Sequence, residues 1–167
     1  MIAAFLLLLA PLAPQAAPDP LAGAKAGKLQ CGGPNIEKKS CMSLTRYKVN
    51  RDGSFEASTT LLVAPSPMIT MEVKSTGKVE GGALCGPVRK ADFDAGTLSV
   101  DGKPAEPAMT DAVRAQIAAT IAPMDGKIGC SRETPDGAVS KVELTLDGIA
   151  HPELTQRALW VKPEDGY

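Results

Sequence analysis

The stretch TRYKVNRDGSFEASTTLLV, residues 45–63, decides the fold that the sequence predicts. Apolar and small residues alternate here with charged and polar ones on both sides of an Asn-Arg-Asp-Gly turn at 50–53. The alternating set is Thr45, Tyr47, Val49, Phe55, Ala57, Thr59, Leu61 and Val63. A period of two is typical of a strand with one buried face, and Gly53 supplies the positive φ that a tight hairpin needs. The stretch therefore predicts a β-hairpin with Tyr47 and Phe55 facing inward.

The same period recurs along the rest of the chain. Residues 69–73 alternate before an expected turn at 75–78, and a short strand is expected at 98–100. A second hairpin is expected to turn at 134–137, and a last strand to cover 158–162. Val142, Leu144 and Leu146 form the inward face of that second hairpin.

One segment has the period of a helix. Five apolar residues recur at three- and four-residue steps: Met109, Val113, Ile117, Ile121 and Met124. Thr110 can cap the helix, and Pro123 ends it, which predicts a helix over about 110–122. We therefore expect an α+β fold, an antiparallel sheet built from hairpins with one packed helix. A β-sandwich with an accessory helix is the alternative.

The N-terminal residues predict export. Residues 2–13, IAAFLLLLAPLA, carry no charge and are too short to span a bilayer, as in the apolar part of a signal peptide. We expect a signal peptide over 1–17, with cleavage after Ala24 or Ala26 as alternatives, and a periplasmic or secreted protein. A buried N-terminal helix is the competing interpretation. We further expect a flexible leader over 18–30 and a single domain over 31–167. We expect no integral membrane segment in the mature chain.

Four cysteines, an even number, predict two disulfides in an exported chain. They are Cys31, Cys41, Cys85 and Cys130. Three pairings are possible, of which Cys31–Cys41 with Cys85–Cys130 is favoured, because the first pair closes a loop rich in turn formers. The spacings fit neither a zinc site nor a Cys-x-x-Cys redox site.

The charges nearly cancel, with 18 Lys and Arg against 19 Asp and Glu, but their distribution is uneven. Residues 20–51 hold seven basic residues and one acidic residue, whereas residues 52–167 hold eleven and seventeen. The composition excludes collagen, coiled coils and wholly disordered chains. The basic segment suggests an anionic envelope component as partner; the alternative is that it packs beside the acidic body. Export and the isoelectric point of about 5.9 argue against a nucleic-acid partner.

No catalytic, cofactor-binding or metal-binding residue is predicted. His151 is the only histidine and lies in a turn without a partner motif. Ser75-Thr76-Gly77-Lys78 matches Ser-x-x-Lys by letter, but that motif works on a helix, and this segment lies between strand patterns. The only site residues assigned are the four cysteines, as disulfides.

Several short stretches of the chain resemble small uncharacterised exported proteins of Gram-negative bacteria. They are Leu29-Gln30-Cys31, Cys41, Cys85-Gly86, Cys130, residues 159–163 (LWVKP) and Asp165-Gly166-Tyr167. The resemblance implies no activity. We expect a non-enzymatic envelope binding or interaction module. A secreted protease inhibitor that uses the stiff Pro65-Ser66-Pro67 loop is the first alternative, and a small hydrolase is the second.

Overall fold

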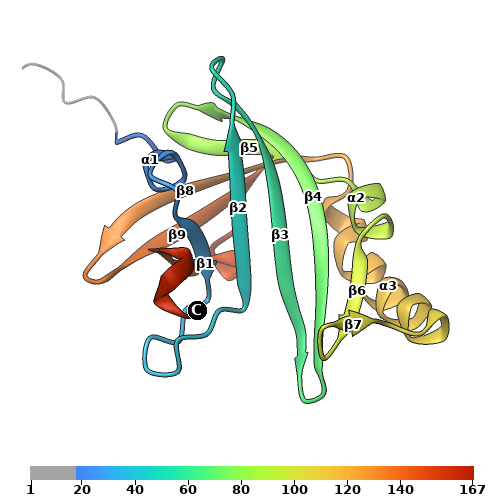
Figure 1. The fold of residues 1–167 in the computed structure, drawn as a ribbon. Coiled ribbons are helices and arrows are strands. Elements are labelled where there is room, and N and C mark those ends of the chain that lie inside the picture. The colour runs from blue at the N-terminus through green and yellow to red at the C-terminus, as the bar shows by residue number, and fades with distance from the viewer. Residues whose placement is uncertain (1–17) are drawn as a thin grey trace, which may run out of the picture.

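The protein is a closed antiparallel barrel of eight strands, seen in a computed structural model that describes residues 18–167 (Figure 1). The predicted signal peptide lies outside the described residues. The strands are β1 (Leu29–Gly32), β2 (Ser43–Val49), β3 (Ser54–Pro65), β4 (Met68–Glu80), β5 (Ala83–Pro87), β6 (Thr97–Val100), β7 (Lys103–Pro104), β8 (Ile128–Asp136), β9 (Val139–Leu146), β10 (Ile149–Ala150) and β11 (Gln156–Val161). The helices are α1 (Ala22–Lys25), α2 (Lys90–Asp94) and α3 (Pro107–Ile121), with 3-10 turns η1 (Ala122–Met124), η2 (Pro152–Leu154) and η3 (Pro163–Asp165).

The barrel strands follow one another in chain order, each antiparallel to the next. The order is β1-β2-β3-β4-β5-β8-β9-β11, and β11 returns to β1 with Gln30 opposite Trp160. The expectation of an α+β fold is therefore wrong, and so is the β-sandwich alternative. Hairpin patterns are the same in an open sheet, a sandwich and a barrel; what distinguishes them is the pairing of the first strand with the last, which no local pattern encodes.

Two glycines let the wall curve where β4 meets β5. A Cβ atom on Gly86 would lie 2.6 Å from the carbonyl oxygen of Thr76, and one on Gly77 would collide with the carbonyl of Cys85 and the ring of Phe55. Only glycine allows the two backbones to approach this closely. The turn expected at 75–78 is absent, because β4 continues through Gly77 as a strand.

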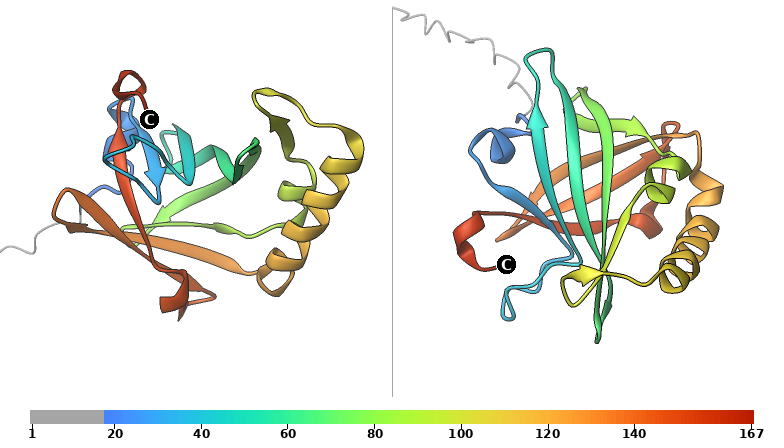
Figure 2. Two further views of the ribbon diagram at one scale, coloured as in Figure 1. Left: turned by 90° about the horizontal axis from the view of Figure 1, so that it is seen from below. Right: turned by 45° about the vertical axis from the view of Figure 1, so that its right-hand side comes forward.

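A 40-residue segment, 88–127, is inserted between β5 and β8 and lies beside β4 (Figures 1 and 2). Its two ends form a neck, with the Val88 amide donating to the Lys127 carbonyl at 2.8 Å. Strand β6 pairs with the first residues of β4, and α2 and α3 cover that pair by packing Phe93, Val113 and Ile117 on a small core. That core is Met71, Val73 and Leu98.

The predicted helix is present as α3, but it begins three residues earlier than expected. Pro107 occupies its first turn, and Glu106 is the N-cap. Thr110 does not cap the helix; its hydroxyl donates to the Glu106 carbonyl one turn back, at 3.1 Å. In the described part of the chain, no helix has the length and apolar character needed to cross a membrane.

Residues 18–30, expected to be a flexible leader, hold α1 and the start of β1. Leu21 has no exposed surface and packs inside the barrel against Phe55, Ala57 and Leu84. The Asp19 carboxylate fixes this turn: it accepts from the Leu21 amide at 3.0 Å and pairs with Lys25 at 2.6 Å. The N-terminal segment therefore plugs one end of the barrel, and we call Leu21 its stopper.

Both disulfides are present, with the pairing favoured from the sequence. Cys31–Cys41 closes the loop between β1 and β2 on the outside of the barrel, beside Leu29 and Val161. Cys85–Cys130 joins β5 to β8 at directly opposite positions. The second bridge thus ties the two strands from which the inserted segment departs.

Candidate functional site

The interior of the barrel is a candidate site. Because side chains alternate along a strand, every second residue of each barrel strand faces inward. On β4 these residues are Met71, Val73, Ser75, Gly77 and Val79, all buried or half-buried, while the residues between them are exposed. Tyr47 and Phe55 also point inward, as the sequence predicts, and their rings meet edge to face at 5.4 Å.

A hydrogen-bond network spans the interior near α1. The Tyr47 hydroxyl donates to Gln30 Oε1 at 2.7 Å, and Gln30 Nε2 in turn donates to the Glu133 carboxylate. The other carboxylate oxygen accepts from the Trp160 indole at 3.3 Å. Burial raises the pKa of Tyr47 well above its usual value, and the charge of Glu133 raises that pKa further. Tyr47 therefore stays a neutral donor over the physiological pH range.

Beyond this network lies a cavity of about 230 Å³, which we call the lumen. It is lined from six strands, β2, β3, β4, β5, β8 and β9, by Thr45, Tyr47, Phe55, Ala57, Thr59, Ser75, Thr76, Leu84, Cys85, Gly86, Pro87, Val88, Gly129, Cys130, Ser131 and Leu144. No charged side chain of residues 18–167 is among them. An eight-stranded barrel is just wide enough to hold one small ligand when side chains do not fill it. The lining suits a compound with an apolar body.

One side of the lumen has an opening in the wall, which we call the window. Strand β4 pairs with β6 through Ile69–Glu72 and with β5 through Lys78–Glu80; between them, residues 73–77 have no partner strand on this side in the described chain. Gly86 packs against Thr76 and Gly77, so the opening is centred on residues 73–75. Arg89, Asp92 and Phe93 lie across it.

Two surface depressions meet the lumen at the window. One, of about 230 Å³, is largely apolar and includes Leu61, Val73, Val88 and Phe93. The other, of about 310 Å³, is polar and includes Lys74, Arg89 and Asp92. Ser75 lines both depressions and the lumen. The two depressions and the lumen therefore adjoin at this side chain.

Two larger depressions lie on the outer wall. One, of about 570 Å³, runs over β3, β4 and β5, and the other, of about 760 Å³, over β5, β8 and β9. They share Glu80 and Cys85. The charged groups along them are largely paired with one another, as in Lys78–Glu80 and Lys141–Glu143, each at 2.6 Å. We favour the lumen as the site because its lining comes from six barrel strands and carries no charged side chain, whereas both outer depressions are lined in part by charged ones.

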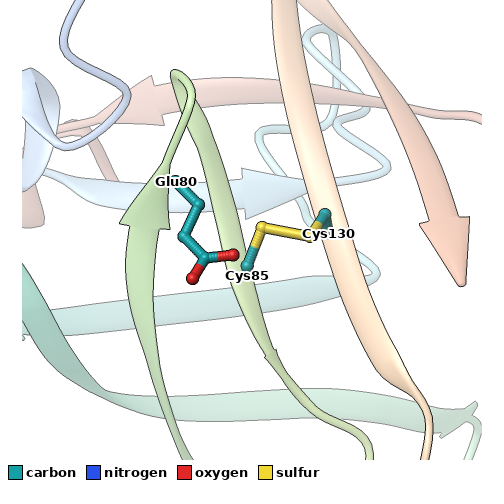
Figure 3. Close-up of side chains that lie close together, drawn as sticks. All are labelled: Glu80, Cys85 and Cys130. Carbon is teal, nitrogen blue, oxygen red and sulfur yellow. A yellow bond between two sulfur atoms is a disulfide. The ribbon is translucent and has the colours of Figure 1, made fainter. Parts of the chain in front are cut away.

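Glu80, Cys85 and Cys130 form a cluster that resembles a metal site, with potential ligand atoms within 4.8 Å of one another (Figure 3). The two sulfur atoms are bonded to each other, however, and a disulfide sulfur is not the thiolate that binds metals. Glu80 is left as the only carboxylate, and it already pairs with Lys78. The cluster therefore does not form a metal centre.

The residues that the sequence suggested as candidates for chemistry do not lie close together. Ser75 and Lys78 lie three positions apart on β4, so Ser75 faces the lumen and Lys78 faces solvent. His151 Nδ1 contacts the Glu153 carboxylate at 2.7 Å beside the outer wall. Contact with His151 lowers the pKa of Glu153. The loop from Pro65 to Pro67 is the tip of the β3–β4 hairpin, far along both strands from the window.

No known family model, curated protein or solved structure matches the chain.

Sequence reasoning missed the window altogether. Its signal was present in residues 69–80, where the alternation of β4 continues through Ser75 and Gly77 instead of stopping at a turn. A strand of thirteen residues has room for two successive neighbours along one edge, which leaves a gap where one neighbour ends and the next has not begun.

Proposed function

We propose that the protein is an exported, non-enzymatic binding protein that holds one small, largely apolar compound in the lumen. The observation that carries the proposal is an uncharged cavity inside a closed barrel, reached through a gap in its wall at Ser75. A cavity of about 150 Å³ in a protein core can hold benzene. On that scale the lumen has room for roughly nine non-hydrogen atoms.

The polar groups of the lumen support the same class of ligand. Thr45 and Thr59 contribute hydroxyls that bond to each other at 2.9 Å, and Ser75 and Ser131 add two more on other strands. A few hydroxyls in an apolar lining favour a compound with one neutral polar group, because each buried polar atom of the ligand then finds a partner. A medium-chain alcohol such as 1-octanol is a suitable probe.

Filling the lumen should weaken binding strongly. Ser75→Phe places a ring inside the lumen, in the volume that the ligand would occupy, so we expect the affinity for 1-octanol to fall at least about tenfold, equivalent to about 1.4 kcal/mol. Calorimetric titration measures this affinity. The fluorescence of Trp160, the only tryptophan, gives a second readout, because its ring centroid lies 5.9 Å from that of Tyr47, which lines the lumen.

Two further variants make this test decisive. Ser131→Leu fills the lumen from the opposite wall, so it should reduce affinity even if the ring at position 75 turns outward. Thr60→Phe is the matched control, since Thr60 is exposed on the outer face of β3. Unchanged binding in both lumen variants, folded by circular dichroism, would exclude the lumen as the site.

The envelope location rests on the N-terminal sequence and on two disulfides, which persist in oxidising compartments. The structure makes the expected cleavage site more specific, because Asp19 and Leu21 are part of the fold. Cleavage after Ala24 or Ala26 would remove the stopper of the barrel. We expect mass spectrometry of the exported protein to find an N-terminus before Asp19. An N-terminus at Lys25 or Gly27 would contradict this.

The protease-inhibitor alternative stays a prediction carried by one feature. Met68 follows the loop of Pro65 to Pro67 and is 46% exposed, so a protease could reach it. Stoichiometric inhibition of a protease that is lost in Met68→Ala would favour this alternative over ligand binding.

A further inference from the structure

We infer that the ligand of the lumen carries a negatively charged head group, which Lys74 and Arg89 hold at the window. This inference rests on the proposed function and adds the chemical class of the ligand: a small amphipathic anion such as a medium-chain carboxylate.

Lys74 and Arg89 are the two cations of this depression, which also contains Glu56, Asp92 and Ser75. Both are exposed, and neither forms an ion pair with any residue between 18 and 167. A cation without a partner at the mouth of a cavity is available to a ligand. Lys74 extends from β4 and Arg89 from the segment just before α2, so they flank the window from its two sides.

The acidic groups nearby leave an excess of positive charge. Glu56 is paired with Lys48 at 3.1 Å, and these two charges cancel. Asp92 is the remaining carboxylate of the depression. Arg46 adds a third cation, since Arg46, Ser58 and Lys74 lie opposite one another on β2, β3 and β4. Glu72, two positions before Lys74 on the same face of β4, adds a second carboxylate, so counting Arg46, Lys74 and Arg89 against Glu72 and Asp92 gives a net charge of +1 around the window.

The surroundings of these cations are apolar on the inner side. Val73, Val88 and Phe93 line the path from the window, and no charged side chain of the described chain lines the lumen beyond. A ligand with one anionic end and an apolar body would thus keep its charge in solvent contact at Lys74 and Arg89 while burying its body. A dianion or a ligand charged at both ends would have to bury a charge without a partner.

A matched pair of probes tests the inference, namely octanoate and 1-octanol. The two differ in charge, and both are close to the size that the lumen admits. We expect wild-type protein to bind octanoate more tightly, by roughly three- to tenfold, as for a solvent-exposed charge pair. Salt should weaken octanoate binding and leave 1-octanol binding nearly unchanged, because salt screens only the charged contact.

Lys74→Met and Arg89→Gln should each reduce octanoate affinity by roughly threefold, and the double variant should remove the preference over 1-octanol. Arg157→Gln is the control, because Arg157 is an exposed cation on β11 away from the window. Asp92→Asn should have the opposite effect and strengthen octanoate binding.

The possible outcomes separate the two claims. Equal affinities for octanoate and 1-octanol, unaffected by the variants, would overturn the anionic head group and leave the lumen as a binding site. Binding of neither probe to wild-type protein would overturn the proposed function as well. Octanoate binding that Lys74→Met and Arg89→Gln leave intact but Ser75→Phe abolishes would place the head group elsewhere.

Discussion

Replacing Cys85 and Cys130 together by serine should lower the free energy of unfolding by about 4 kcal/mol, the loop-closure value for a separation of 45 residues. A domain of this size has about 5–15 kcal/mol in total, so the loss is a large fraction of it. The structure adds a reason for a large effect, since this bridge joins β5 to β8 where the 88–127 segment leaves the barrel. Urea unfolding of the double variant measures the change.

The other disulfide provides the comparison. Cys31–Cys41 spans a separation of only 10 residues, for which the same relation gives about 2.8 kcal/mol. The Cys31→Ser/Cys41→Ser variant should therefore unfold at a higher urea concentration than the Cys85→Ser/Cys130→Ser variant. Equal midpoints, or the reverse order, would contradict this ranking.

Shortening Leu21 to alanine should cost about 2–5 kcal/mol, the usual range for a fully buried leucine. The side chain belongs to a short N-terminal turn, but it packs among residues of three barrel strands: Phe55 and Ala57 of β3, Leu84 of β5 and the half-buried Tyr47 of β2. Removing it leaves a hole at the end of the barrel, which the surrounding strands are too constrained to close. Thermal unfolding by circular dichroism gives the change.

Ile36→Ala is the matched control for Leu21→Ala. Ile36 is also a large aliphatic residue outside the barrel strands, but it is 51% exposed, so its loss should change stability by less than about 0.5 kcal/mol. Similar destabilisation by both variants would contradict the stopper role of Leu21. No effect of Leu21→Ala would do the same.

The strands of the barrel were predictable where one face alternates clearly. Residues 45–63 give β2 and β3 nearly in full, and the inward positions of Tyr47, Phe55 and Val142 follow from the same period. Strand β5 was missed because it is short and has no polar alternation; Ala83, Leu84 and Cys85 are all buried. A strand buried on both faces gives only a run of apolar residues, which is also compatible with a helix or a loop.

Closure of the barrel was not predictable, for a different reason. It depends on β1 pairing with β11, whose residues are about 130 positions apart, as in Cys31 opposite Leu159. The candidate site could not be predicted for the same reason, because the lumen exists only once the barrel wall is closed. The order of neighbours along β4 decides where the window lies, and that order is set by the tertiary pairing with β5 and β6.

The most direct test of the account is where a bound ligand lies. Nuclear Overhauser contacts between 1-octanol and the methyl groups of the protein report this position. We expect contacts to Leu84, Leu144 and Val88, which line the lumen from three sides. Contacts confined to exposed methyl groups such as those of Ile36 or Ile149, with none to the lumen, would contradict the claim that the barrel is the binding site.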